Sequence, residues 1–519
     1  LSGNAFDLSD GVVEVPGEVP TIQEAIDASS DGDTVLVAAG TYVENITIDK
    51  EIAVIGADRE TTIIDGDSSG SVVYFGSNAG TGALLKDFTI QNGTGRYGPH
   101  AASDALCGGG IFLDDGSSPK LKRLIITNNR AEGRGAGIFK NTGATLLVRN
   151  TIINNNHGTD NSQLNGAGIG GDGGGDGSII YGCTIENNHA TNESGGIHLP
   201  DHPVIINTII ANNTSNYRSS AIYAWGASIS NCTIMSNGDD GNSNNDPALM
   251  TLGGQSLIQN TIIWDNYSVG KTIYYDNELR VEYSIIEGLN ENFVDNSGPG
   301  QSFQFVDNTS NDPLLNDDLS FQSSSPAIDL GNPNGFYNDS DGTRNDIGHL
   351  GGNGIIVLYD RSWENIILNN SDISNIKFGY VGVGNAQEEY ELFIYNCSQN
   401  DISFTSYSTT DDQFDTRFWY LENSTWPLTI PAMSNTFSTG GFGMWLEYNP
   451  TTAGSHSATF TLYSDDIPGS GYGTLGMSGI ALDVPAGNIH VPADAPTIQA
   501  AIDIAPSGKT IVVAPGEYF

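Results

Sequence analysis

The sequence predicts an all-β protein in which a solenoid of stacked coils is followed by a β-sandwich, in a tandem arrangement. The chain has 519 residues and 65 glycines, and its apolar runs are short. This pattern is typical of many short strands joined by tight turns. One strand motif recurs at steps of 23 to 28 residues from Thr184 onward. After residue 353, apolar and polar side chains alternate over longer segments, which favours the strands of a sandwich.

The recurring strand has a β-branched centre and commonly ends in asparagine. It is found at residues 87–92, 124–129, 150–155, 182–188, 207–213, 231–237, 260–266 and 282–288. We expect the following residues to occupy equivalent positions: Thr89, Thr151, Thr184, Thr208, Thr233, Thr261 and Ser284. A second strand follows at residues 108–112, 135–139, 166–170, 194–198 and 219–223. Two strands and their turns then form one coil, whose Ile side chains stack on those of neighbouring coils.

Asparagine is abundant directly after the first strand of the coils, for example at Asn128, Asn129, Asn187 and Asn188. Asn tolerates the left-handed backbone of tight turns, and stacked copies can share side-chain hydrogen bonds. We therefore expect a structural ladder of asparagines. A polar ladder that binds sugars or ice is the alternative.

The two ends of the chain repeat each other. Residues 1–43 align without a gap on residues 477–519, at a constant offset of 476, and 20 of the 43 positions are identical. We therefore expect a tandem array with a period of about 476 residues, and both termini to lie inside modules. Within the repeat, Thr21 and Glu24 predict a capped helix over residues 21–28. This helix is expected to cover the apolar end of the solenoid.

The coil repeats resemble the pectate-lyase-like superfamily of right-handed parallel β-helices over roughly residues 15–350. The spacing in ITNNRAEGRGAGIF and IENNHATNESGGIH is similar to the repeats of polymorphic outer-membrane and autotransporter-type surface proteins. Residues 312–352 are similar to the tail of many large bacterial β-helix surface proteins. The resemblance implies a right-handed parallel β-helix. It leaves the activity open, because the superfamily contains both enzymes and structural stalks.

Residues 353–485 resemble an immunoglobulin-like domain of the ASPM/SPD-2/hydin type. The resemblance rests on NIKFGYVGVGN at residues 375–385, on the turn YNPTTAG and on the closing LGMSGIAL. We predict four domains in the chain. They are the closing strand of a preceding immunoglobulin-like domain (1–11), the β-helix (12–352), the immunoglobulin-like sandwich (353–485) and the start of a next β-helix (486–519).

The net charge of −43 comes from 62 acidic and 19 basic residues. Binding a phosphate backbone needs clustered Lys and Arg, so nucleic acid is not an expected partner. The acidity indicates either solubility with self-repulsion, or the binding of divalent cations by carboxylate clusters or life in salty water. No 18-residue apolar stretch occurs, so no membrane span is expected. The architecture favours an extracellular, cell-surface location.

Cys183 and Cys232 are predicted to occupy the same position two coils apart, with Asn207 between them. At the spacing of parallel strands their separation is about 9–10 Å. This exceeds the reach of a disulfide bond. We therefore expect two free thiols.

A candidate calcium site lies in NDSDGTRND at residues 338–346. Asp339, Asp341 and Asp346 are spaced around Gly342 partly like the oxygen ligands of an EF-hand-type loop. The alternative is a turn in which these side chains bond to the backbone.

The pectate-lyase resemblance implies that an enzyme of this kind needs carboxylates holding calcium beside an Arg or Lys base. Candidate residues of these types are Asp114, Asp115, Lys122, Arg123, Arg134 and Arg149. The sequence alone does not show that they converge, and the motifs of polygalacturonases and pectin methylesterases have no evident match. His198, Asp201 and His202 are close in sequence, but HLPDH is expected to be a surface turn. No catalytic residue is therefore assigned.

Three functions remain open. The first is a structural or adhesive surface protein, whose partners are copies of itself, neighbouring repeats or surface polysaccharide. The second is a secreted polysaccharide lyase that acts on acidic glycans. The third is a carbohydrate-binding β-helix without catalysis. The tandem repeat favours the first, because a fibre is made of repeated rods whereas catalysis has little need for them.

Overall fold

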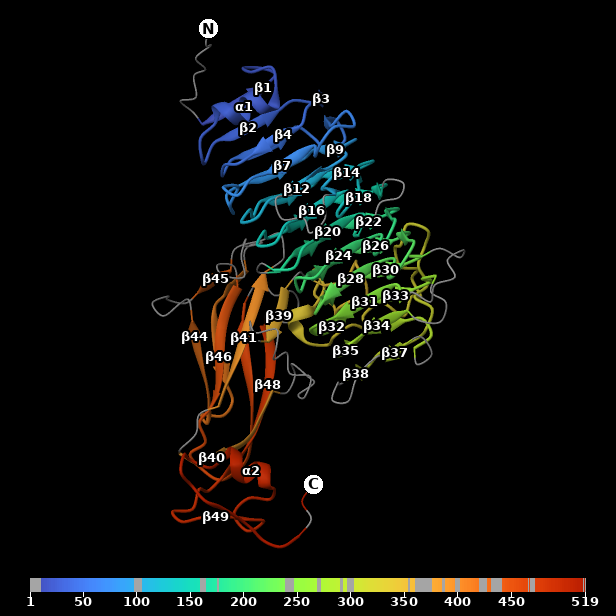
Figure 1. The fold of residues 1–519 in the computed structure, drawn as a ribbon. Helices are drawn as coiled ribbons and strands as arrows, with labels where there is room; N and C mark the ends of the chain where they lie inside the picture. The colour runs from blue at the N-terminus through green and yellow to red at the C-terminus, as the bar shows by residue number, and fades with distance from the viewer. Residues whose placement is uncertain are drawn as a thin grey trace. The chain divides into compact units, whose positions relative to one another are not determined.

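The computed structural model describes residues 11–97, 105–158, 165–174, 177–238, 247–267, 272–289, 293–295, 303–352, 355–359, 376–384, 388–396, 402–419, 427–430, 441–464, 466, 472–516 and 518. The chain divides into two compact units (Figure 1). The first comprises residues 1–332, 345–352 and 435–437, and the second comprises residues 333–344, 353–434 and 438–519. The predicted domain boundaries stay predictions, and residues 1–10 lie outside the described part of the chain.

The first unit is a solenoid of three parallel sheets, here called A, B and C. Sheet A has twelve strands in the order β1 (Val12–Val15), β2 (Thr34–Val37), β5 (Ala53–Gly56), β8 (Leu84–Lys86), β13 (Lys120–Lys122), β17 (Leu147–Arg149), β21 (Ile179–Tyr181), β25 (Val204–Ile206), β29 (Ser228–Ser230), β32 (Gln255–Gln259), β35 (Glu278–Glu282) and β38 (Phe303–Val306). Sheet B has ten strands in the order β3 (Gly40–Val43), β6 (Thr62–Asp65), β9 (Thr89–Gln91), β14 (Ile125–Thr127), β18 (Ile152–Asn154), β22 (Thr184–Glu186), β26 (Ile209–Ala211), β30 (Thr233–Met235), β33 (Ile262–Trp264) and β36 (Ile285–Ile286).

Sheet C also has ten strands, and these run in the chain order β4 (Ile46–Ile48), β7 (Val73–Phe75), β12 (Ile111–Leu113), β16 (Ile138–Lys140), β20 (Ile169–Gly171), β24 (Ile197–Leu199), β28 (Ile222–Trp225), β31 (Leu249–Leu252), β34 (Ile273–Tyr275) and β37 (Phe293–Asp295). Four two-residue strands form a further parallel sheet, namely β15 (Arg130–Ala131), β19 (His157–Gly158), β23 (His189–Ala190) and β27 (Thr214–Ser215). An antiparallel pair joins β10 (Arg96–Tyr97) to β11 (Leu106–Cys107).

The expectation of two strands per coil was wrong, because a typical coil contributes one strand to each of the three sheets. The missed strands are those of sheet A. Only two residues, Asn150 and Thr151, separate β17 from β18. The sequence LLVRNTIIN therefore reads as a single strand although the chain turns in its middle.

The solenoid is filled by one continuous apolar core. Each short strand points its apolar side chains inward, and parallel pairing stacks them in columns, as with Ile153, Ile185 and Ile210, all 0% exposed. Helix α1 (Ile22–Ala28) adds Ile22, Ala25 and Ile26 to this core. The hydroxyl oxygen of Thr21 accepts a hydrogen bond from the backbone N–H of Glu24 at 3.2 Å, which confirms the predicted cap.

A buried asparagine ladder stabilises the turn after sheet B. Its members are Asn129, Asn156, Asn188, Asn213, Asn237 and Asn266, and each side-chain amide donates to the side-chain oxygen of the next at 3.0–3.1 Å. The residue before several ladder members has a left-handed backbone, with φ between 53° and 55° at Asn128, Asn155, Asn187 and Asn212. The structural interpretation of the asparagines is therefore confirmed in these coils, since both of its parts are observed.

A second ladder runs along the turn between sheets A and B, and it corrects the predicted equivalence of the threonines. Thr184 pairs with Ile152 and Ile209, so Thr151, Thr208, Thr261 and Ser284 lie one position earlier, level with Cys183 and Cys232. The residue between the two cysteines is thus Thr208 rather than Asn207. Its hydroxyl oxygen accepts a hydrogen bond from the Cys183 N–H at 3.3 Å. Cys183 and Cys232 are free, as predicted, and both are buried.

The end of the first unit covers the outer side of sheet B. Ile262 and Ile285 pack there against Ala327 and Ile347. The backbone N–H of Ile347 donates to the carbonyl of Ala327 at 2.8 Å. The irregular segments at residues 309–332 and 345–352 therefore bury apolar side chains of the last coils.

The second unit contains two four-stranded sheets that share one core. One sheet has the order β39 (Ile355–Tyr359), β41 (Glu388–Asn396), β46 (Gly441–Tyr448) and β44 (Phe414–Trp419), and the other has the order β40 (Ile376–Gly382), β48 (Tyr472–Leu482), β47 (Gly454–Tyr463) and β43 (Ser406–Thr409). Smaller elements are β42 (Ile402–Phe404), β45 (Leu428–Ile430) and the 3₁₀ helix η1 (Gly335–Tyr337). Phe378, Phe414, Tyr448 and Phe460 belong to the shared core. This arrangement is consistent with a β-sandwich, and its immunoglobulin-like character stays a prediction.

The second unit ends in a copy of the first coil of the solenoid. It consists of β49 (Ile489–Val491), α2 (Ile498–Asp503) and β50 (Ile511–Val513). Ile489 pairs with Ile511 in parallel, as Val13 pairs with Val35 at an offset of 476 residues. The hydroxyl oxygen of Thr497 caps α2 by accepting from the Ala500 N–H at 3.0 Å.

Candidate functional site

Positive charge gathers on sheet A. Lys86, Lys122 and Arg149 are the last residues of β8, β13 and β17, and the parallel register pairs them directly. Neighbouring strands lie about 4.8 Å apart, so these three side chains leave one side of the sheet at that spacing. We call them the basic column. In the next coil, Arg149 pairs with Tyr181, and its guanidinium lies 5.1 Å from the centre of the Tyr181 ring.

Further charged groups surround the basic column at the turn into sheet B. Asp87 and Arg123, which follow Lys86 and Lys122, have left-handed backbones with φ of 62° and 54°. The Arg123 Nε–H donates to Asp87 Oδ1 at 2.6 Å, and Lys86 Nζ lies 3.3 Å from Asp87 Oδ2. Arg59 reaches the same turn, where its Nη1–H donates to the carbonyl of Asn150 at 3.2 Å.

Three carboxylates are thus close to this group of cations, and one of them is Glu60, whose Oε1 lies 3.4 Å from Arg59 Nε. Asp87 is 9% exposed, whereas Asp58, which lies 3.9 Å from Arg123 Nη2, is 49% exposed. Burial, followed by the charges of Arg149 and Lys86, lowers the pKa of Lys122. A lysine with a lowered pKa is more readily deprotonated and can act as a base. The net positive charge favours the binding of a polymer that carries regularly spaced anionic groups.

The structure brings together only part of the predicted catalytic set. Lys122, Arg123 and Arg149 converge, whereas Asp114 and Asp115 follow β12 in sheet C. The Asp114 carboxylate accepts hydrogen bonds from the Tyr74 hydroxyl at 2.5 Å and from the Asn141 amide at 3.2 Å. It therefore does not contribute to the basic column.

Arg134 also lies elsewhere, where its guanidinium bonds to the Asp172 carboxylate. Sequence reasoning missed Arg59, Lys86, Asp58 and Asp87. A signal for Lys86 and Asp87 was present, because they lie three and two residues before β9, as Lys122 and Arg123 lie before β14.

The expectation that HLPDH is a surface turn was wrong for three of its residues, because His198, Leu199 and Asp201 are 5%, 0% and 3% exposed. Asp201 Oδ2 lies 3.0 Å from Lys140 Nζ and accepts from the Ser178 hydroxyl at 2.7 Å. His198 Nε2 lies 3.4 Å from Glu193 Oε2 instead. The two side chains therefore belong to different clusters, and nothing in their contacts links them as a catalytic pair.

The predicted calcium ligands have hydrogen-bond partners of their own. Asp341 Oδ1 accepts from the N–H and hydroxyl of Thr343 at 2.9 and 2.7 Å, and Asp346 Oδ1 accepts from the Asp329 N–H at 2.7 Å. Asp339 and Asp341 belong to the second unit, whereas Asp346 belongs to the first. In the described part of the chain, no group of three or more His, Cys, Asp or Glu side chains is placed to hold a metal ion. Calcium binding at these residues stays a prediction.

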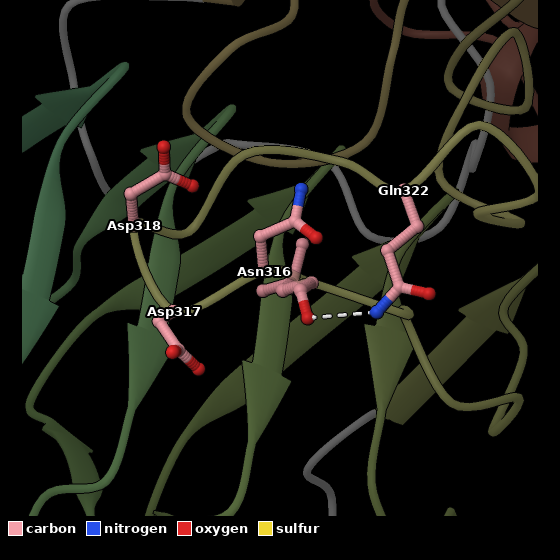
Figure 2. A pocket seen from close by; sticks show the side chains of 5 residues that line it. Asn316, Asp317, Asp318 and Gln322 are labelled. Atoms are coloured by element: carbon pink, nitrogen blue, oxygen red, sulfur yellow. Dashed lines mark hydrogen bonds between the residues drawn. The ribbon is translucent and has the colours of Figure 1, made fainter.

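An open hollow of about 520 Å³ lies beside the last coils and is lined by Leu315, Asn316, Asp317, Asp318 and Gln322 (Figure 2). The Gln322 amide donates to the Leu315 carbonyl at 3.1 Å. Hydrogen bonds from Ser320 lower the pKa of Asp318, which is exposed. Polar groups of the hollow, such as the Gln322 amide and the Asp318 carboxylate, therefore take part in a hydrogen-bonded turn.

These features define the first unit as a parallel β-helix with a basic face in an otherwise acidic chain. Residues 36–241 match the family described as "Right handed beta helix region". This part of the chain is therefore a right-handed parallel β-helix, as the sequence predicted. A search of curated proteins found no match. Among the described residues, no helix is long and apolar enough to cross a membrane.

Three solved structures align weakly with parts of the chain. The secreted serine protease VesC from Vibrio cholerae is 15% identical over 21% of this chain and 22% of its own, with a TM-score of 0.16. A family 123 glycoside hydrolase from Clostridium perfringens is 10% identical over 26% and 30%, with a TM-score of 0.18. The PapD-like domain 7 of human CEP192 is 12% identical over 26% and 88%, with a TM-score of 0.17. The chain thus spans less than a third of the first two proteins, and these scores carry no functional argument.

Proposed function

We propose that the chain is part of an extracellular structural or adhesive surface protein in which β-helices and sandwich units alternate in a tandem array. The right-handed β-helix region fits a surface or carbohydrate-related protein. Copies of the chain or neighbouring repeats would be its first partners. In this function the solenoid is a rigid spacer, because each added coil lengthens the rod and rests only on its neighbours.

The observation that carries the proposal is the duplicated first coil. Strand pairing, helix position and helix cap recur at residues 12–37 and 488–513, with a constant offset of 476. A repeated boundary between sandwich and solenoid supports an array of rods. A single catalytic domain gives no reason for such a repeat.

The test is electron microscopy of the native assembly that contains this chain. Twelve strands of sheet A at the parallel-strand spacing predict rods of about 53 Å. We expect such rods to recur along an axis, separated by smaller densities. Isolated particles without an axial repeat would contradict the proposal.

A second candidate function is the binding, or the cleavage by a lyase, of an acidic glycan at the basic column. It is supported by the clustering of Arg59, Lys86, Lys122, Arg123 and Arg149, five of the 19 basic residues in a chain of net charge −43. Two carboxylates beside a lysine of lowered pKa are the groups that a calcium-assisted lyase would use.

Polygalacturonate is a suitable probe for the second candidate. Binding through the column predicts that affinity falls as salt rises and falls about tenfold or more in Lys122→Ala, while Lys509→Ala, distant in sequence, leaves it unchanged. A lyase would additionally raise the absorbance near 235 nm when calcium is present. Equal binding by both variants would exclude the basic column as the site.

A further inference from the structure

A second cluster lies on the outer side of sheet C, on the strand β28 and the turn before it. Tyr217 and Trp225 are each 44% exposed. Tyr223 and Trp225 are two residues apart on β28, so both point away from the core. A group of large exposed aromatic side chains indicates an interaction site, whereas single exposed ones are common on protein surfaces.

A polar network supports these aromatic side chains. His198 stacks on Tyr223 with ring centres 4.5 Å apart and an angle of 9° between the planes. Its Nε2 lies 3.4 Å from Glu193 Oε2, and Arg218 Nη1 lies 3.8 Å from Glu193 Oε1. The Arg218 guanidinium also lies 5.3 Å from the centre of the Tyr217 ring.

The charge states in this network follow from its contacts. Burial lowers the pKa of His198, so the ring is neutral near pH 7 and can donate one N–H to Glu193. The hydrogen bond from His198 lowers the pKa of Glu193 further, so the carboxylate stays ionised. The Arg218 side chain is 45% exposed and compensates this charge. Glu193 and Arg218 thus carry opposite charges, and together they present both hydrogen-bond donors and acceptors.

On one side of the Trp225 indole, the next coil presents glycine backbone. A Cβ atom built on Gly253 in the next coil would lie 3.6 Å from the Trp225 ring, and one built on Gly226 would collide with His202. Gly253 and Gly226 have φ of 59° and 56°, a backbone conformation that favours glycine. The strands therefore place an exposed indole next to bare backbone, and the Gly253 N–H there donates to Asp276 at 2.8 Å.

We propose that Tyr217, Trp225, Glu193 and Arg218 form a binding site for uncharged sugar residues of a glycan. The ligand class follows from the chemistry of the cluster. The apolar C–H face of a pyranose ring can pack on the indole, while its hydroxyls pair with the carboxylate and guanidinium. An anionic polymer is disfavoured at this cluster because Arg218 is already paired with Glu193.

This inference deepens the proposed adhesive role by naming a partner, and it is separate from the basic column. The two can fail independently. Electron microscopy tests the array, whereas glycan binding tests the aromatic cluster. A chain that binds no sugar could still form rods, and an isolated β-helix could still bind sugar.

The experiment is affinity electrophoresis of the 519-residue chain in gels that contain galactomannan, xyloglucan or dextran. We expect retardation by at least one of these neutral polysaccharides, and a loss of affinity of about tenfold or more in Trp225→Ala, since truncation of a central aromatic anchor dominates binding. Tyr267→Ala is the matched control, because Tyr267 is 54% exposed but lies outside the cluster. It should bind as the unaltered chain does.

Arg218→Ala provides a second variant at an exposed position, which keeps the test valid if Trp225→Ala fails to fold. We expect it to weaken binding severalfold with an unchanged circular dichroism spectrum. The proposal is overturned if no neutral polysaccharide retards the chain, or if the correctly folded cluster variants bind as well as Tyr267→Ala. Binding of polygalacturonate alone, sensitive to Lys122→Ala, would also overturn it and would assign glycan binding to the basic column.

Discussion

The first coil at residues 12–37 and its copy at residues 488–513 share their strand pairing but differ in burial. Ile22 and Ile26 are 0% and 2% exposed, whereas the corresponding Ile498 and Ile502 are 38% and 51% exposed. In the first copy the next coil contacts the helix, where the Lys50 ammonium bonds to the carbonyls of Ile26 and Ser29. The same strand pairing thus forms whether these two isoleucines are buried or exposed, while Ala501 of α2 is 0% exposed, as Ala25 of α1 is.

This difference separates two contributions to the fold. Strand register and helix caps depend on residues within the coil, so they recur in both copies. Burial depends on the neighbouring coil, as expected for a solenoid whose stability is shared between adjacent repeats. The two contributions can be tested separately, because the chain offers positions where burial is complete, absent or partial.

The largest loss in the free energy of unfolding is expected inside a coil that has neighbouring coils on both sides. Lys140 points into the solenoid, and its side chain and that of Asp201 are both 0% exposed. Asp201→Asn leaves the lysine charge buried without its ion pair, which costs about 3–5 kcal/mol. Urea denaturation of the first unit measures this loss. A cost below about 1 kcal/mol would show that the pair is not buried as described.

The double variant Lys140→Met with Asp201→Leu is the control for the charge. Replacement of a buried ion pair by apolar side chains of similar size is often neutral. We therefore expect it to recover most of the stability lost in Asp201→Asn. A double variant as unstable as the single one would assign the loss to packing instead.

The two copies of the first coil allow a matched pair of substitutions. Ile26→Ala removes a buried side chain and is expected to cost about 2–5 kcal/mol. Ile502→Ala at the equivalent exposed position is expected to cost no more than about 0.5 kcal/mol in the 519-residue chain. Hydrogen exchange of peptides from residues 12–37 and 488–513 resolves the two coils. Equal losses of protection would contradict the dependence of burial on the neighbouring coil.

Sequence periodicity predicted the parts of the fold that repeat. The apolar strands of sheets B and C, the asparagine turns and the Thr21 cap each depend on residues close in sequence. Sheet A was missed because only Asn150 and Thr151 separate its strand from the next. The threonine alignment was off by one residue in several coils because Thr occurs both at the turn (Thr208) and at the first strand position (Thr184).

The candidate sites were harder to predict because their members come from different coils. Lys86 and Lys122 are 36 residues apart whereas Lys122 and Arg149 are 27 apart, so no constant step links the basic column. Asp201 neutralises a lysine that lies 61 residues earlier in the chain. Such contacts depend on which residues of neighbouring coils pair. This register cannot be predicted until the insertions between strands, which differ in length from coil to coil, are located.

His349 lies in the irregular segment at residues 345–352, and its partial burial should make the stability of the first unit depend on pH. Burial lowers the pKa of His349 to about 4, and its Nδ1 lies 2.9 Å from the Thr233 hydroxyl. The unfolded chain then binds the proton more readily than the folded one, so stability falls as pH drops from about 6.5 towards 4. The loss is about 2–3 kcal/mol once its partial exposure is considered. His349→Gln should reduce this acid sensitivity in urea titrations at pH 7.5 and 4.5. An acid sensitivity unchanged in His349→Gln would contradict the assignment to this side chain.

The smallest effect is expected at the helix caps, where the two copies should behave alike. Thr21 and Thr497 each accept a hydrogen bond from the N–H three residues later, at 3.2 and 3.0 Å. Substitution of either by Ala removes a cap and costs about 1 kcal/mol. Because this contribution is local, hydrogen exchange of α1 and α2 should change by similar factors in the two variants. A loss of stability only in Thr21→Ala would mean that the cap depends on the following coil. The contribution of the cap would then depend on burial and not on the local sequence alone.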